Sequence, residues 1–137
     1  MSMVVDTCVI LDVLECDPTF GEASADVLEN YASVGLLIAP VTYVELAPAF
    51  LGDEHRERSF LSEIGIEMPP VYGEDDLSLA HAAWNRHIQS KRAKKTARRP
   101  VADVLIGALA KANDGLITRN AKDFAALFPD LNLVVPR

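Results

Sequence analysis

The chain has 137 residues, half of them hydrophobic, which is enough for one domain, residues 1–137, around a sizeable core. No stretch approaches the roughly 18 consecutive apolar residues of a membrane span, and the first residues lack the basic and apolar regions of a secretory signal. Two cysteines without metal-site spacing favour a reducing, cytoplasmic setting. A net charge of −7 is unusual for a nucleic-acid-binding protein, but the charge is unevenly distributed.

The N-terminal part of the chain contains two short apolar segments that are typical of buried strands. The first covers residues 3–6, and a helical turn or two follows it. Apolar side chains then recur at a helical period over residues 20–31, and Gly35 is well placed to end that helix. The second strand is expected at residues 36–39.

The next helix is interrupted by a proline. It is expected to begin at Thr42 and to end before Gly52. Pro48 lies inside it and has no N–H group to donate, so the helix should kink or split there. A charged amphipathic helix over residues 53–64 and a third short strand over residues 65–68 follow.

The C-terminal half continues the alternation of helices and strands. A long helix is expected from residue 74, with an inner face formed by Leu77, Ala80, His81, Trp84 and Ile88. Pro100 suits the first position of another helix. The remaining elements are a strand at residues 116–118, a short helix at 122–128 and a strand at 133–135.

Residues 91–99, between those two helices, form a basic strip. The strip holds six of the 13 Lys and Arg residues and no acid. Such a strip on an acidic body is suited to guiding a polyanion or an acidic partner. A solvated helix end is the alternative interpretation.

Short apolar strands that alternate with helices predict an α/β fold in which a parallel sheet is flanked by helices on both faces. Ligands of such sheets bind outside the carboxyl ends of the strands. Four acids are expected at that edge, either just after a strand or in the first turns of a helix: Asp6, Glu45, Asp103 and Asp123. Grouped carboxylates repel one another unless a cation lies between them, and hard divalent cations prefer oxygen ligands.

Each acid also has a purely structural interpretation. These are a turn or helix cap for Asp6, a capping box on the Thr42 amide for Glu45, the helix dipole for Asp103, and a helix that Asn120 caps for Asp123. The acids are expected on one edge of one sheet, whereas four caps could lie anywhere in a fold. Their conjunction therefore favours a metal site.

The pattern resembles the PIN-domain ribonucleases, and in particular the VapC-type toxins of prokaryotic toxin–antitoxin pairs. The motifs that carry the resemblance are residues 4–7, 44–46, 102–110, 116–124 and 133–136, in the order expected for the family. The resemblance implies a parallel sheet with strand order 3-2-1-4-5. It also implies an endoribonuclease that depends on Mg²⁺ or Mn²⁺, a cognate antitoxin that inhibits it, and a homodimer.

Matched by position, Asp6, Glu45 and Asp103 correspond to the metal-binding acids of the family, and Asp123 is the candidate for the fourth. Many members have Asp where this chain has Asn120, which can offer a carbonyl oxygen but no charge. Thr118 matches a hydroxyl position that helps to orient the acids or a water. Thr7, beside Asp6, and Asn120 are further supporting candidates.

The resulting hypothesis is hydrolysis of RNA phosphodiester bonds with one or two divalent ions, which requires no nucleophilic side chain. The RNA backbone would contact a set of basic residues: Lys91, Arg92, Lys94, Lys95, Arg98, Arg99 and Arg119. Residues 48–51 are a candidate apolar docking face for the antitoxin, with core packing as the alternative.

Three other classes of protein are alternatives to this hypothesis. A catalytically degenerate PIN-fold protein would keep a protein-binding groove without turnover, as Asn120 and Pro48 suggest. A phosphohydrolase of small molecules often carries a second Asp two residues after the first, where this chain has Cys8. A receiver-like signalling domain normally begins with paired acids, but Asp6 follows Val5.

Overall fold

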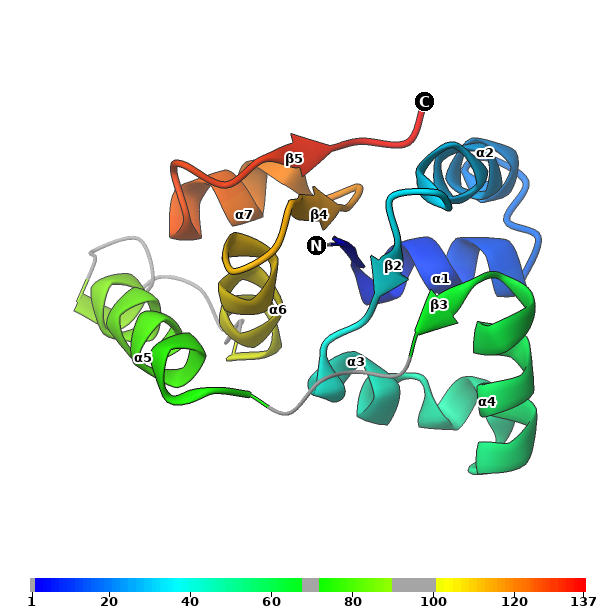
Figure 1. The fold of residues 1–137 in the computed structure, drawn as a ribbon, viewed down its shortest axis with the longest axis horizontal. Coiled ribbons are helices and arrows are strands. Elements are labelled where there is room, and N and C mark those ends of the chain that lie inside the picture. The colour runs from blue at the N-terminus through cyan, green and yellow to red at the C-terminus, as the bar shows by residue number, and fades with distance from the viewer. Residues whose placement is uncertain (1, 68–71, 90–100) are drawn as a thin grey trace.

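The computed structural model of the chain describes residues 2–67, 72–89 and 101–137. The described residues form a sheet of five parallel strands in the order β3-β2-β1-β4-β5, which confirms the predicted fold (Figure 1). The strands are β1 Met3–Val5, β2 Leu36–Leu37, β3 Ile66–Glu67, β4 Gly115–Ile117 and β5 Leu133–Val134. None of the helices in these ranges is long and apolar enough to cross a membrane.

Helices connect the strands and cover both faces of the sheet. They are α1 Thr7–Leu14, α2 Gly21–Tyr31, α3 Pro40–Glu45, α4 Glu54–Glu63, α5 Glu74–Gln89, α6 Val101–Lys111 and α7 Ala121–Leu127. A short 3₁₀ helix, η1, covers Ala47–Phe50. In Figure 1 the helices α5, α6 and α7 lie on the left, and α1, α2 and α4 lie on the right.

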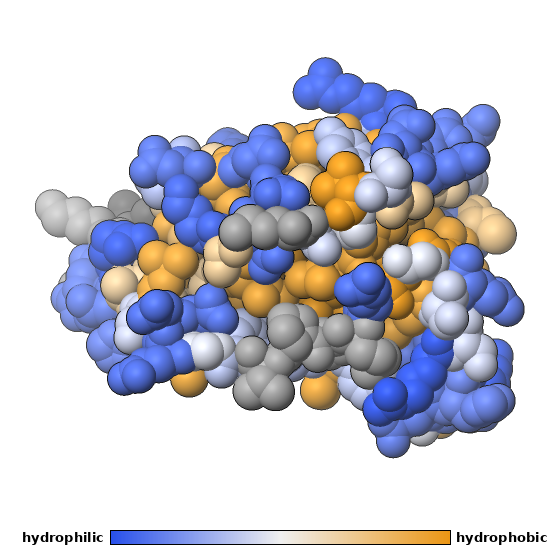
Figure 2. Space-filling view, viewed as in Figure 1, coloured by the Kyte–Doolittle hydropathy of each residue, from blue (hydrophilic) through white to orange (hydrophobic). Residues whose placement is uncertain are grey.

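The central strands are buried on both faces, which divides the core into two clusters. Successive side chains of β1 point to opposite faces. Val4 accordingly packs with Val104 of α6 and Phe124 of α7, whereas Val5 packs with Ile10 of α1. Viewed from the same side as Figure 1, hydrophobic residues occupy the middle of the visible face and hydrophilic residues surround them (Figure 2).

The segment between β2 and α4 differs from the prediction in where its helix begins. The helix α3 starts at Pro40, with Ala39 as its N-cap, and not at Thr42. Proline at a first helical position loses no hydrogen bond, and its fixed φ suits a helix. The expected split at Pro48 is confirmed, because α3 ends at Glu45 and η1 follows it.

The inner face of α5 was predicted incorrectly in part. Only Ala80 and Ala83 of this helix are buried, while Leu77 is 51% exposed and Ile88 is 38% exposed. His81 is also exposed. Two alanines present a narrow contact surface, so α5 packs against α6 with small side chains and leaves its larger ones at the margin.

Candidate active site

The candidate site begins where β1 and β4 end side by side. Parallel pairing places Val5 opposite Ile117, so Asp6 and Thr118, the next residue of each strand, are also neighbours. The Asp6 amide donates to the Ile117 carbonyl at 2.9 Å. The Thr118 hydroxyl donates to Asp6 Oδ2 at 2.7 Å. Asp6 therefore lies at the carboxyl edge of the sheet, where ligands of such folds bind.

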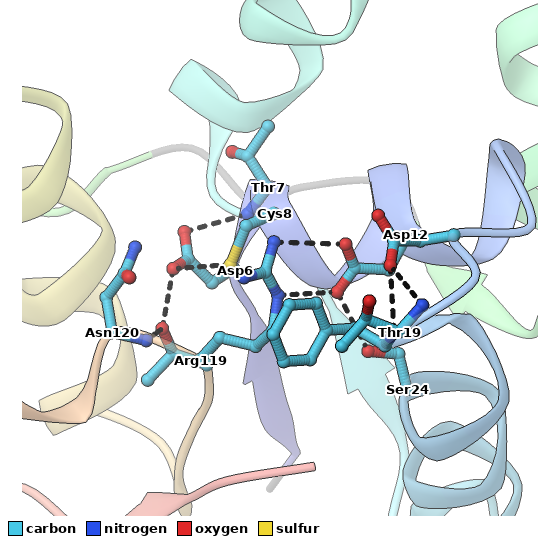
Figure 3. Close-up of polar contacts among 11 residues, drawn as sticks. Asp6, Thr7, Cys8, Asp12, Thr19, Ser24, Arg119 and Asn120 are labelled. Atoms are coloured by element: carbon cyan, nitrogen blue, oxygen red, sulfur yellow. Dashed lines mark hydrogen bonds and ion pairs between the residues drawn. The ribbon is translucent and has the colours of Figure 1, made fainter.

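Asp6 is 5% exposed, and its carboxylate is held by donors on several sides. It is the N-cap of α1, and its Oδ1 accepts from the Thr7 amide at 2.8 Å (Figure 3). The Cys8 thiol donates to Oδ2 at 3.4 Å. With Thr118, the described residues supply three donors, whereas an ionised carboxylate offers about four lone-pair sites. The capping interpretation is thus correct, and these donors leave about one lone-pair site of the carboxylate unused.

Thr7 joins Asp6 to Glu45. The Thr7 hydroxyl donates to Glu45 Oε1 at 2.8 Å, while the Thr7 amide is the donor to Asp6. The Thr7 hydroxyl also lies 3.1 Å from the hydroxyl of Thr42, which is fully buried. Two of the predicted acids are therefore linked through a single residue at the start of α1.

The alternative interpretation of Glu45, a capping box on the Thr42 amide, is wrong. Because α3 begins at Pro40, Thr42 lies within the helix, and its amide donates to the Ala39 carbonyl at 3.0 Å. The exposed side chain of Glu45 instead reaches Thr7 of the neighbouring helix. The structural alternative for this acid is thereby removed.

Asp103 and Asp123 occupy the first turns of α6 and α7, respectively, as expected. The side chain of Asp103 is half-buried and that of Asp123 is exposed. Each makes an interaction of its own. Asn120 is the N-cap of α7 by position, but its side chain makes no capping hydrogen bond within the described part of the chain.

The four acids do not form a closed cluster. Within residues 2–67, 72–89 and 101–137, no group of three or more His, Cys, Asp or Glu side chains is arranged to hold a metal ion. Mg²⁺ does not require such a cage, because it usually keeps several waters and binds one or two carboxylates together with substrate phosphates. The oxygen donors of Asp6 and Glu45 fit that chemistry.

Arg119 follows Thr118 and binds Asp12, an acid of α1 that was not among the predicted site residues. Its Nε and Nη2 donate to the two Asp12 carboxylate oxygens at 2.7 and 3.0 Å. The Ser24 hydroxyl donates to the same carboxylate at 3.1 Å, and the guanidinium carbon lies 4.1 Å from the centre of the Phe20 ring. The hydrogen bonds to Asp12 raise the pKa of Arg119, which keeps it charged.

The sequence matches the PIN domain family over residues 3–127. This chain belongs to the PIN domain family. No curated protein shows significant similarity to it.

Two solved structures have the same fold as this PIN domain. One is the crystal structure of VapBC2 from Rickettsia felis bound to a DNA fragment from their promoter, with 18% identity, a TM-score of 0.70 and coverage of 98% of each chain. The other is a toxin–antitoxin complex from Klebsiella pneumoniae, with 22% identity and a TM-score of 0.67, covering 99% of this chain and 98% of that one. At these identities the likeness concerns the fold of the PIN domain.

The basic strip of the PIN domain, residues 91–99, and Pro100 lie outside the described residues. The six strip residues predicted to bind RNA therefore remain predictions. The seventh, Arg119, is described, and its contact with Asp12 occupies two of its nitrogen atoms. Its predicted contact with phosphate would have to use its remaining donors.

Proposed function

We propose that this PIN domain is an endoribonuclease that depends on Mg²⁺ or Mn²⁺ and acts as the toxin of a toxin–antitoxin pair in the cytoplasm. The observation that supports the proposal most directly is the arrangement around Asp6. A buried carboxylate stands at the carboxyl edge of the sheet, held by Thr7 and Thr118 and linked through Thr7 to Glu45.

Asp6 and Glu45 would hold the divalent ion, and Asp103 and Asp123 are proposed to complete the site. The ion would supply Lewis-acid polarisation of the phosphate and an acidified water. The chain itself orients the acids: the Thr118 hydroxyl fixes one oxygen of Asp6, and Thr7 fixes the other through its amide. The Thr7 hydroxyl also fixes Glu45.

The basic strip is proposed to hold the RNA backbone. Contacts between Lys or Arg side chains and phosphates release counterions, so the affinity that they provide falls as salt concentration rises. They position the RNA without reading its sequence. Choice of substrate would then depend on RNA shape or unpaired bases.

An antitoxin partner is proposed because the chain resembles VapC-type toxins and its structural neighbours are VapBC2 and a toxin–antitoxin complex. The expected docking face at residues 48–51 is only partly available. Phe50 is 3% exposed and belongs to the core, whereas Leu51 is 88% exposed. Homodimerisation is proposed on the family resemblance alone.

The second candidate is a PIN-fold binding module without turnover. The absence of a three-acid group within the described residues favours it, as does the uncharged Asn120. Such a module would bind its protein partner but would not cleave RNA.

Incubation of the purified protein with total RNA, with Mn²⁺ or with EDTA, tests the proposal. We expect cleavage with Mn²⁺ and none with EDTA. Asp6→Asn should abolish cleavage without unfolding the protein, because Asn caps a helix about as well as Asp. Asp53→Asn is the matched control, since Asp53 caps α4, away from the site. Full activity of Asp6→Asn would contradict the proposal.

A further inference from the structure

The segment from Thr118 to Asn120 is bound to α1 at two places. Thr118 donates to Asp6, the N-cap of α1, and Arg119 donates to Asp12, near the end of the same helix. The Asn120 amide also donates to the Thr118 hydroxyl at 2.9 Å, which turns the segment back on itself. Figure 3 shows the Asp6 and Asp12 carboxylates on either side of the Arg119 side chain.

We propose that the Arg119–Asp12 ion pair is a positioning device for the Asp6 carboxylate. The ion pair holds the segment against α1, so that the Thr118 hydroxyl stays within reach of Asp6 Oδ2. This inference rests on the proposed function, because it assigns to Arg119 a role in the metal site. That role differs from the phosphate contact expected from the sequence.

The ion pair is suited to this role because it is rigid. Asp12 is 4% exposed, so its carboxylate depends on the partners that it has in the structure. Two parallel hydrogen bonds fix the plane of the guanidinium, which a lysine cannot reproduce. Ser24 of α2 restrains the same pair through its hydrogen bond to Asp12, and Phe20, the residue before α2, restrains it through the contact of its ring with Arg119.

The side chain of Arg119 is 29% exposed, and within the described residues its hydrogen bonds go to Asp12 and not to Asp6 or Glu45. The positioning effect on Asp6 passes through the backbone to Thr118, and the charge of Arg119 also acts on Cys8, whose thiol donates to Asp6. If the ion pair were purely stabilising, its removal would lower the melting temperature without changing how Asp6 is held. The two roles are separated by measurements on Asp6 itself and on the groups that bind it.

The first test is Mn²⁺ titration of the full chain by calorimetry, with Arg119→Gln, Arg119→Lys and Thr118→Val. Residues that orient metal ligands typically change affinity about 10- to 100-fold when replaced. We expect Arg119→Gln to weaken Mn²⁺ binding about tenfold and Arg119→Lys to restore only part of the loss. Adding Thr118→Val to Arg119→Gln should weaken binding no further than the worse single variant, because both act on the same hydrogen bond. Arg58→Gln, which removes an exposed ion pair with Glu54, is the matched control.

The second test does not require a metal. Amide hydrogen exchange by NMR reports the Thr7 and Asn120 amides, which donate to Asp6 and to the Thr118 hydroxyl. Exchange at Leu116, whose amide donates within the sheet, corrects for global opening. We expect Arg119→Gln to speed exchange at Thr7 and Asn120 relative to Leu116, and Arg58→Gln to leave all three unchanged.

The outcomes distinguish the inference from the proposed function. If the wild type does not bind Mn²⁺, the proposed function fails, and the exchange data alone decide whether Arg119 positions the segment. If the wild type binds Mn²⁺ and Arg119→Gln binds it equally well with unchanged relative exchange, the inference is overturned while the proposed function stands. Additive losses in Arg119→Gln and Thr118→Val would also overturn it.

Discussion

Replacing Thr118 with valine removes a hydroxyl while keeping the shape of a fully buried side chain. The hydroxyl donates to the Asp6 carboxylate at 2.7 Å and accepts from the Asn120 amide at 2.9 Å. A hydrogen bond to a charged group contributes about 1.5–3 kcal/mol to stability. Since Asp6 is 5% exposed, water cannot readily replace the lost donor. We therefore expect Thr118→Val to destabilise the protein by about 1.5–3 kcal/mol.

Thermal and urea denaturation measure this loss. At about 4 °C per kcal/mol for a chain of this size, the melting temperature should fall by about 6–12 °C. Thr118→Ser keeps the hydroxyl and should lose less than half as much. If Thr118→Val melted within about 2 °C of the wild type, the hydrogen bond to Asp6 would contribute little, and the description of this buried site would be wrong.

Three further predictions concern Glu57, the two cysteines and the basic strip. Glu57 is 2% exposed, its Oε2 has no partner among the described residues, and burial raises its pKa. The folded state therefore binds the proton of the Glu57 carboxyl more tightly than the unfolded state does. The stability of the wild type relative to Glu57→Gln should thus fall as pH rises from the unfolded-state pKa of about 4.3 through the raised pKa of the folded state. Urea unfolding between about pH 4 and 8 measures that difference, and a flat difference would contradict it. Burial, followed by the charge of Asp6, raises the pKa of Cys8 to about 12, so iodoacetamide should alkylate the exposed Cys16 first, as peptide mass spectrometry can verify. The basic strip can lose four of its charges by replacement of Lys94, Lys95, Arg98 and Arg99. This should weaken RNA binding and flatten its salt dependence in filter-binding assays. An unchanged slope of affinity against salt concentration would exclude the strip as the RNA-binding surface.

The sheet could be predicted from the sequence because its strands are short, continuously apolar and separated by helical patterns. The position of Asp6 followed from the end of the first strand, and the split at Pro48 followed from the missing N–H group. These features depend on local chemistry, which a single sequence displays directly.

The incorrect predictions concern features that depend on tertiary packing. Pro40, which follows the strand expected at residues 36–39, suits the start of a helix, and the false capping box followed from a helix expected to begin at Thr42. Leu77 and Ile88 have the right spacing for a core face, but α5 meets α6 through its alanines.

Asp12 was missed because a lone acid on a helix is ordinarily a surface residue. One signal was present in the sequence: Asp12 lies among Val9, Ile10 and Val13 in a helix that is otherwise strongly apolar. A buried acid needs a partner, but the sequence could not indicate that Arg119, more than a hundred positions away, supplies it.

Calorimetric titration of the wild type and Asp6→Asn with Mn²⁺ tests most directly whether carboxylates at the edge of the sheet capture a divalent cation. We expect the wild type to bind Mn²⁺, and Asp6→Asn to lose at least about tenfold in affinity while its circular dichroism stays unchanged. Equal affinity in the two proteins, or no binding by the wild type, would contradict the proposed metal site.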